Sequence, residues 1–212
     1  MSTLVKTCGM FREEDIRAVN AARPDYCGFV IDYPRSHRSV DMQRARELRA
    51  LLDPDIAAVG VFVDMEPQRV AEAAQACSLD AVQLHGNEDE GYLQTLRHYS
   101  DVRIIQAFTS RDERGLEAAR RSSAHCVLLD SGKGTGETFD WNLLAGFERP
   151  YFLAGGLSAD NIAQAIAELS PFAVDLSSGL ETNRLKDPLK IAQAVAAVRA
   201  CNENLQFERT GQ

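Results

Sequence analysis

Short apolar segments rich in β-branched residues recur eight times along this chain, and this recurrence limits its fold more than any other feature. Amphipathic helical patterns separate most of the segments. Because parallel strands are joined by helix-length crossovers, the alternation predicts a parallel sheet. The expected strands are 4–7, 26–31, 57–63, 81–84, 103–108, 126–129, 151–153 and 172–176. The expected helices are 13–22, 41–52, 67–77, 88–96, 111–121, 160–169 and 188–200, with a weaker short helix at 141–144.

Eight such units favour a closed barrel over an open doubly wound sheet, which has fewer strands. We therefore predict an α/β fold, a single small (β/α)8 TIM barrel. No Pro- or Ser-rich linker divides the units, so residues 1–212 form one predicted domain. Asp160 and Asp187 are expected to cap helices, with Pro188 at a first helical position. Periodicity fades after about residue 201, which predicts a frayed C-terminal tail.

Composition excludes several classes of partner. The formal net charge of -8 argues against general nucleic-acid binding, which needs a basic surface. A small anion is compatible with an acidic chain, because backbone amides can bind a phosphate locally. The sequence has no signal-like N-terminus and no apolar run of membrane-spanning length, so we expect a cytoplasmic protein with no membrane partner. The five cysteines form no CxxC pair and fit neither a disulfide framework nor a zinc site.

Chemically useful side chains follow the predicted strands, where the active sites of such barrels form. Because the carboxyl ends of all eight strands meet at one face, we expect these side chains to share a pocket. They are Cys8, Arg38, His85, Asp130 and Asp175.

Three glycine-containing turns follow the last three predicted strands: "DSGKGTGETFDW", "LAGGLSADN" and "VDLSSGLE". Glycine lets backbone amides approach a ligand closely, and loops after the last two strands commonly bind phosphate in this fold. Each turn alone can be merely a tight turn, but together they predict a phosphorylated small-molecule ligand. The candidate binding residues are Gly134, Gly155, Gly156, Ser177, Ser178 and Gly179.

Cys8 and Asp130 are candidates for proton transfer. Lys6 shares the predicted strand face of Cys8 and would favour its thiolate, since a nearby positive charge lowers a thiol pKa. Cys8 can equally be a small buried hydrophobe, the usual fate of a free cysteine. Asp130 can project over the barrel mouth as a general acid or form a surface turn. Position alone leaves both pairs of alternatives open.

Three further residues are candidates for holding a ligand. The Arg38 guanidinium can bind a carboxylate through paired hydrogen bonds or simply be solvated. His85 is expected to orient a ligand or a loop rather than act as a base. Asp175 is expected to shape the pocket or hold the loop beyond it. The sequence has no metal-spaced cluster, HExxH motif or dinucleotide fingerprint, so it indicates no metal and no cofactor.

Seven stretches, in order from about residue 4 to residue 200, together resemble the phosphoribosylanthranilate isomerase family, which is built on a small (β/α)8 barrel. They are "VKTCG", "GFVIDYPRSHR", "VGVFVD", "VQLHG", "VLLDSGKGTGETFDW", "LAGGLSADN" and "AVDLSSGLE…KD". The resemblance implies the Amadori rearrangement of N-(5-phosphoribosyl)anthranilate to 1-(2-carboxyphenylamino)-1-deoxyribulose 5-phosphate, the third step from chorismate in tryptophan biosynthesis. It also implies that Cys8 is the general base and Asp130 the general acid. Arg38 would meet the anthranilate carboxylate, and the glycine and serine turns the phosphate.

The chain departs from the family pattern at two positions. Asp32 is inserted ahead of Arg38, and Gln106 stands where a lysine is more common. Alternative functions are another sugar-phosphate barrel enzyme and a non-catalytic phosphate-binding barrel. An indoleglycerol-phosphate synthase would need lysines and glutamates at strand ends, and a histidine-pathway isomerase an aspartate in place of Cys8. The sequence leaves the oligomeric state open between monomer and homodimer.

Overall fold

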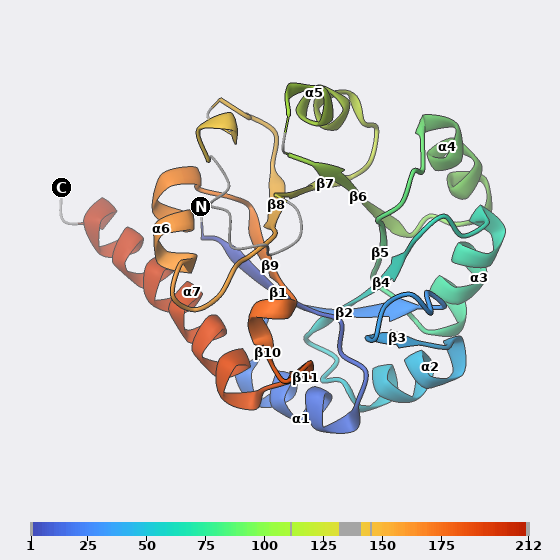
Figure 1. The fold of residues 1–212 in the computed structure, drawn as a ribbon, viewed down its shortest axis with the longest axis horizontal. Coiled ribbons are helices and arrows are strands. Elements are labelled where there is room, and N and C mark those ends of the chain that lie inside the picture. Colours follow the sequence, from blue (N-terminus) through green and yellow to red (C-terminus); the bar gives the residue numbers. More distant parts are fainter. Residues whose placement is uncertain (1, 111, 132–140, 145, 211–212) are drawn as a thin grey trace.

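The computed structural model describes residues 2–110, 112–131, 141–144 and 146–210. Eight parallel strands close into a barrel through the pairing of β1 with both β2 and β9, and helices surround it (Figure 1). The predicted (β/α)8 barrel is therefore confirmed. The barrel strands are β1 (Leu4–Cys8), β2 (Tyr26–Ile31), β4 (Ala57–Phe62), β5 (Ala81–Leu84), β6 (Arg103–Thr109), β7 (Cys126–Asp130), β8 (Tyr151–Ala154) and β9 (Ala173–Leu176).

The helices follow the strands in the expected order, with one capping residue corrected. They are α1 (Glu13–Ala22), α2 (Met42–Leu51), α3 (Pro67–Ala76), α4 (Glu90–Tyr99), α5 (Glu113–Arg121), α6 (Ile162–Leu169) and α7 (Pro188–Thr210), with 3-10 helices η1 (Trp141–Leu144) and η2 (Ser178–Leu180). Asp187 caps α7 as expected, since its Oδ1 accepts from the Leu189 amide at 2.9 Å. Asp160 does not cap α6, because that helix begins at Ile162 and Asn161 occupies the capping position.

The C-terminal helix is longer than expected. The chain remains helical to Thr210, so the expected helix end at Ala200 and the frayed tail after about residue 201 are wrong. Asn202 explains part of the extension, because its buried amide bonds both backbone groups of Thr3, at 2.8 and 2.9 Å. Of the helices that the structure describes, none combines the length and apolar character that a membrane crossing requires.

Three short strands in the loops were not predicted from the sequence. They are β3 (Ser39–Val40), which pairs with the end of β2, and the antiparallel hairpin β10 (Glu181–Thr182) and β11 (Leu185–Lys186). Asn183 and Arg184 both have positive φ, the backbone shape of a two-residue hairpin turn. Asp32 also has positive φ, and its amide donates to the Val40 carbonyl oxygen at 2.9 Å. This turn leads the loop after β2 back toward the barrel mouth.

The barrel interior is apolar near the strand starts and polar near the strand ends. Side chains alternate, so Lys6 and Cys8 point inward from β1 while Val5 belongs to the outer core beneath the helices. We call the apolar part the inner apolar cluster: Val59, Ala81, Ile105, Leu128, Phe152, Ala154 and Ala173. Buried polar side chains lie beyond this cluster toward the strand ends, where the candidate site forms.

Candidate active site

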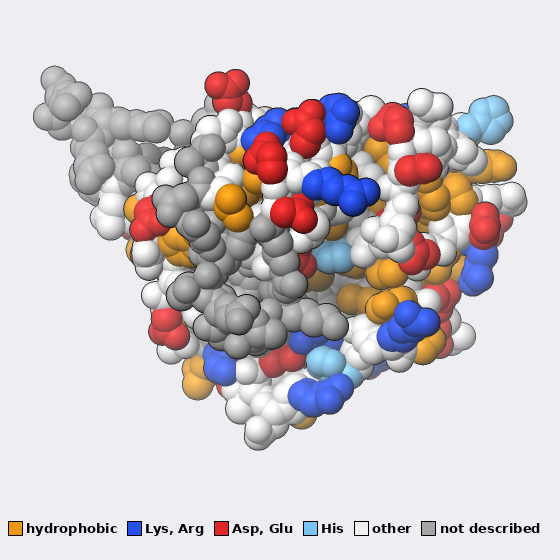
Figure 2. Space-filling view, turned by 45° about the horizontal axis from the view of Figure 1, so that its top comes forward, with side chains coloured by type: hydrophobic (Ala, Val, Ile, Leu, Met, Phe, Trp, Pro, Cys, Tyr) orange, Lys and Arg blue, Asp and Glu red, His pale blue; other side chains and the backbone are white. Residues whose placement is uncertain are grey.

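A cavity of about 520 Å³ opens at the carboxyl ends of the barrel strands. Acidic, basic and histidine side chains are interspersed on the face shown in Figure 2. Apolar residues such as Val61 and Leu157 share the cavity lining with nine of the residues predicted from the sequence. These nine are Cys8, Arg38, His85, Asp130, Gly155, Gly156, Asp175, Ser177 and Ser178.

Gly179, another predicted residue, is not among the described residues that line the cavity. A Cβ atom on Gly179 would lie 2.0 Å from the Leu157 carbonyl oxygen, so this glycine packs the turn after β9 against the turn after β8. Gly134 lies outside the described residues. Gln106 is directed elsewhere, bonding the Glu88 carbonyl and the Ser122 hydroxyl, both at 2.6 Å. Among the described residues, no group of three or more His, Cys, Asp or Glu side chains could hold a metal ion.

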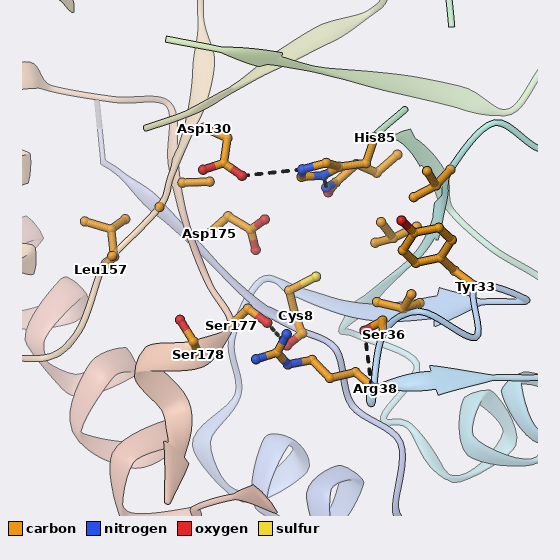
Figure 3. Close-up of a pocket in the computed structure, with 17 residues that line it drawn as sticks. Cys8, Tyr33, Ser36, Arg38, His85, Asp130, Leu157, Asp175, Ser177 and Ser178 are labelled. Carbon is orange, nitrogen blue, oxygen red and sulfur yellow. Dashed lines mark hydrogen bonds and ion pairs between the residues drawn. The ribbon is translucent and has the colours of Figure 1, made fainter. Parts of the chain in front are cut away.

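Cys8 ends β1 with its sulfur toward the cavity (Figure 3), and it is 7% exposed. A Cβ atom on Gly28 of the neighbouring β2 would lie 2.8 Å from Sγ, so only glycine leaves the thiol its place. Burial raises the pKa of the Cys8 thiol; the nearby charge of Lys6 lowers it, and that of Asp175 raises it. The expected help from Lys6 is therefore present, but burial outweighs it.

Lys6 is completely buried and forms an ion pair with Asp175 on β9. Its Nζ donates to both carboxylate oxygens, at 3.0 and 3.1 Å. The strand register sets this pair, because Lys6 and Asp175 are directly opposite in the parallel ladder. Burial would lower the pKa of Lys6, but the charges of Asp175 and Cys8 raise it to about 12. Lys6 is thus a fixed cation beneath the thiol, and Asp175 its counter-ion.

Asp130 ends β7 on the opposite side of the cavity and faces His85, which follows β5 (Figure 3). His85 Nε2 lies 3.4 Å from Asp130 Oδ2, and the Gln83 amide nitrogen lies 2.8 Å from His85 Nδ1. With Gln83 donating to Nδ1, the ring proton sits on Nε2, toward the carboxylate. His85 thus presents its Nε2 proton to the Asp130 carboxylate.

Arg38 lines the cavity from the loop after β2. Its guanidinium donates from Nε and Nη2 to the two carboxylate oxygens of Glu181, the second at 2.9 Å. Lys186 Nζ lies 2.9 Å from the same carboxylate. Burial would raise the pKa of Glu181, but the hydrogen bonds from Arg38 and Lys186 hold it at about 2.

The sequence analysis missed Glu181 and Lys186 as site residues. Both lie within the quoted motif "AVDLSSGLE…KD", and their charges were the available signal. What brings them together is the β10–β11 hairpin, whose register pairs Glu181 with Lys186. That hairpin has only two residues in each strand, too few for a recognisable alternation.

The two glycine and serine turns meet beside Cys8. Gly155 and Gly156 have φ values of +95° and +66°, and a Cβ on Gly155 would lie 2.1 Å from Ser131 Oγ. These positions therefore require glycine. The Ser177 hydroxyl donates to the Cys8 carbonyl oxygen at 3.2 Å, which connects the turn after β9 to the thiol-bearing strand end.

Comparison with known proteins identifies the family. Residues 5–197 match the model of N-(5'phosphoribosyl)anthranilate (PRA) isomerase. The chain belongs to this family. A relative named N-(5'-phosphoribosyl)anthranilate isomerase from Endomicrobium trichonymphae is 41% identical over 201 residues, covering 92% of this chain and 98% of the relative. One of the same name from Chromohalobacter salexigens is 42% identical over 205 residues, covering 92% and 94%.

Solved structures of the family have the same fold. The phosphoribosyl anthranilate isomerase of Thermotoga maritima superposes with a TM-score of 0.85 at 32% identity, covering 94% of this chain and 100% of that one. A structure solved with reduced 1-(o-carboxyphenylamino)-1-deoxyribulose 5-phosphate gives 0.82 at 33% identity, with the same coverage. This chain is accordingly an isomerase of tryptophan biosynthesis. It catalyses the Amadori rearrangement of N-(5-phosphoribosyl)anthranilate to 1-(2-carboxyphenylamino)-1-deoxyribulose 5-phosphate.

Proposed function

We propose that Cys8 is the general base and Asp130 the general acid of this rearrangement. One observation carries the proposal: the two side chains approach the same cavity from β1 and β7, and the glycine and serine turns line it beside them (Figure 3). A sugar held by its phosphate in those turns would lie between a proton donor and a proton acceptor.

Asp130 acts first, by delivering a proton to the furanose ring oxygen. The bond between that oxygen and the anomeric carbon breaks, and the nitrogen lone pair forms a protonated Schiff base. An acid is needed because the ring oxygen would otherwise leave as an alkoxide. His85 supports this step by holding the Asp130 carboxyl group toward the cavity.

Cys8 acts second, as a thiolate that removes the proton from the sugar C2. The electron pair flows to the iminium nitrogen and gives an enolamine, which tautomerises to the ketone product. The cationic neighbours Lys6 and Lys186 both lower the pKa of the thiol and oppose the effect of burial. General acid and base assistance of this kind contributes roughly 10²–10⁴ in rate for each group.

The two ends of the substrate are held by different parts of the site. We assign the phosphate to the turns at Gly155–Gly156 and Ser177–Gly179, and the anthranilate carboxylate to Arg38. A family member crystallised with a phosphorylated, carboxyl-bearing analogue supports a ligand of this class. A relative from Thermotoga maritima is dimeric. We also propose a cytoplasmic location, since sugar phosphates do not cross membranes unaided.

The test generates the substrate from anthranilate and phosphoribosyl pyrophosphate and follows the loss of its fluorescence. The unaltered chain should consume the substrate, and Cys8→Ser should abolish turnover while retaining the circular dichroism spectrum and affinity for the reduced product analogue. A folded Cys8→Ser protein with substantial turnover would remove Cys8 from the mechanism. No turnover by the unaltered chain would favour a phosphate-binding protein without catalysis.

A further inference from the structure

Two cationic side chains and a histidine converge on one carboxylate beside the cavity. The Glu181 side chain is only 8% exposed, and its oxygens accept from Nε and Nη2 of Arg38. Lys186 Nζ lies 2.9 Å from Oε1, and His37 Nε2 lies 3.5 Å from Oε2. Glu181 does not line the cavity itself, so its effect on a ligand has to pass through its neighbours.

These neighbours come from both ends of the proposed ligand site. Arg38 belongs to the loop between β2 and β3, and Lys186 to β11. Lys186 is fully buried and also donates to the Ser177 carbonyl oxygen at 2.9 Å, in the turn assigned to the phosphate. One carboxylate thus joins the arginine assigned to the substrate carboxylate and, through Lys186, the phosphate turn.

The geometry of the pair decides which part of Arg38 is available. A guanidinium offers its donors along fixed edges, and a carboxylate on one edge fixes the plane of the group. Glu181 occupies the edge formed by Nε and Nη2, which leaves the edge formed by Nη1 and Nη2 for a ligand. Gly9 leaves the room that this side chain needs, because a Cβ at that position would lie 2.5 Å from Arg38 Cδ.

We propose that Glu181 is a positioning residue that presents the Nη1–Nη2 edge of Arg38 to the carboxylate of the anthranilate ring. This inference rests on the proposed function, in which Arg38 receives that carboxylate. Glu181 touches no substrate atom in this arrangement. Its removal should therefore weaken recognition of the carboxylate selectively and leave recognition of the phosphate intact.

The experiment measures the affinity of two ligands by calorimetry. One is reduced 1-(o-carboxyphenylamino)-1-deoxyribulose 5-phosphate, and the other is the same molecule without its carboxyl group. For Glu181→Gln, which keeps the shape but loses the charge, affinity for the first ligand should fall about tenfold, as for a lost charge-assisted hydrogen bond. Affinity for the second ligand should stay within about twofold of the unaltered protein. Equal losses for the two ligands would overturn the proposal, because a general distortion of the site predicts them.

Two variants separate the positioning role of Glu181 from the assignment of Arg38 to the substrate carboxylate. Arg38→Met should reduce affinity for the carboxylated ligand only; if it does not, the assignment of Arg38 itself fails. If Arg38→Met behaves as expected and Glu181→Gln has no effect, only the positioning role fails. Glu113→Gln is the matched control, because it removes a glutamate from an exposed arginine pair, with Arg120, on α5. It should change neither affinity.

Glu181→Gln leaves the buried Lys186 without its carboxylate partner and can impair folding. In that case the double variant Glu181→Gln, Lys186→Met removes both buried charges. Lys186→Met alone is the reference, because Lys186 also holds the phosphate turn through Ser177. A further loss in the double variant that is confined to the carboxylated ligand supports the proposal. An equal further loss for both ligands, with a retained circular dichroism spectrum, contradicts it.

Discussion

The two ends of the barrel interior are built from the same strands but from opposite kinds of side chain. The inner apolar cluster contains no charged residue, and Phe152 within it makes edge contacts with Tyr26 and Phe172, with ring centroids 5.4 and 5.7 Å apart. Nearer the strand ends, the interior holds the ion pair of Lys6 with Asp175.

This difference separates stability from chemistry within one barrel. Packing of apolar side chains stabilises the folded state, whereas a buried ion pair loses most of its attraction to desolvation. Such a pair is therefore weak evidence of stability, and here it lies beside the thiol assigned to catalysis. Changes to Cys8 or Asp130 should reduce activity with modest effects on stability, and changes in the inner apolar cluster should do the reverse.

The largest effect is expected on the rate of the reaction, for Asp130→Asn at the polar end. The amide keeps the shape of the side chain but cannot deliver a proton to the ring oxygen, so kcat should fall by roughly 10²–10⁴. Affinity for the reduced product analogue should be retained, because the phosphate turns are unchanged. Stopped-flow fluorescence and calorimetry measure the two quantities. Equal losses of rate and affinity would make Asp130 a ligand rather than the acid.

The next effect is expected at the apolar end, for Phe152→Ala. Removing a buried aromatic ring leaves a cavity, so the free energy of unfolding should fall by about 3–5 kcal/mol while kcat of the folded enzyme is unchanged. Urea denaturation measures the stability. Phe172→Ala is the matched control, because Phe172 is 37% exposed and its loss should be smaller. If Phe152→Ala lowered kcat as much as Asp130→Asn does, stability and activity would not be separated between the two ends of the barrel interior.

The fold could be predicted because its signal is local and repeated. Each barrel strand was located within one residue at either end, since an apolar run between polar helix caps has clear limits. The end of α7 could not be found this way. Its extension depends on the buried contact of Asn202 with Thr3, residues at opposite ends of the chain.

Most of the site residues that could be predicted from the sequence lie at the end of a barrel strand or directly after it. Cys8 and Asp130 follow strands and therefore had to lie at the barrel mouth. The pairing of Lys6 with Asp175 follows from the register of β1 on β9, and Glu181 reaches Arg38 across 143 residues of sequence. No local pattern specifies such partners. The same holds for Gly28, whose importance is the space it leaves for the sulfur atom.

A third effect concerns the dependence of the free energy of unfolding on pH. The pKa of Glu181 is held at about 2 in the folded protein, below its ordinary value of 4.5, so the unfolded chain binds its proton more readily. The stabilisation is therefore present above about pH 4.5 and is lost as the pH falls toward 2. At pH 6 Glu181→Gln should unfold a few kcal/mol more easily than the unaltered protein.

Urea titrations between pH 6 and pH 2.5 measure the difference in free energy of unfolding between the unaltered protein and Glu181→Gln. This gap should narrow steadily as the solution becomes more acidic. Glu47→Gln is the control, because Glu47 also pairs with an arginine, Arg44, but on the surface. Solvent screens such a pair, so its gap should be much smaller at every pH. A Glu181→Gln gap that stays constant with pH would mean that the ionisation of Glu181 does not contribute.

The smallest effect is expected for Gly28→Ala, at the level where the apolar and polar ends of the interior meet. The added methyl group would lie 2.8 Å from Cys8 Sγ and 3.2 Å from Lys6 Nζ, so the sulfur has to move. A displaced base loses rate steeply, and kcat should fall about tenfold while affinity for the reduced product analogue stays the same. Gly91→Ala makes the same chemical change on α4, where the nearest atom is Asp89 Oδ1 at 3.3 Å, and should leave kcat unchanged. If Gly28→Ala kept full activity, the position of the sulfur would not limit the rate. That result would argue against Cys8 as the base, because a base has to lie close to the C–H bond from which it removes the proton.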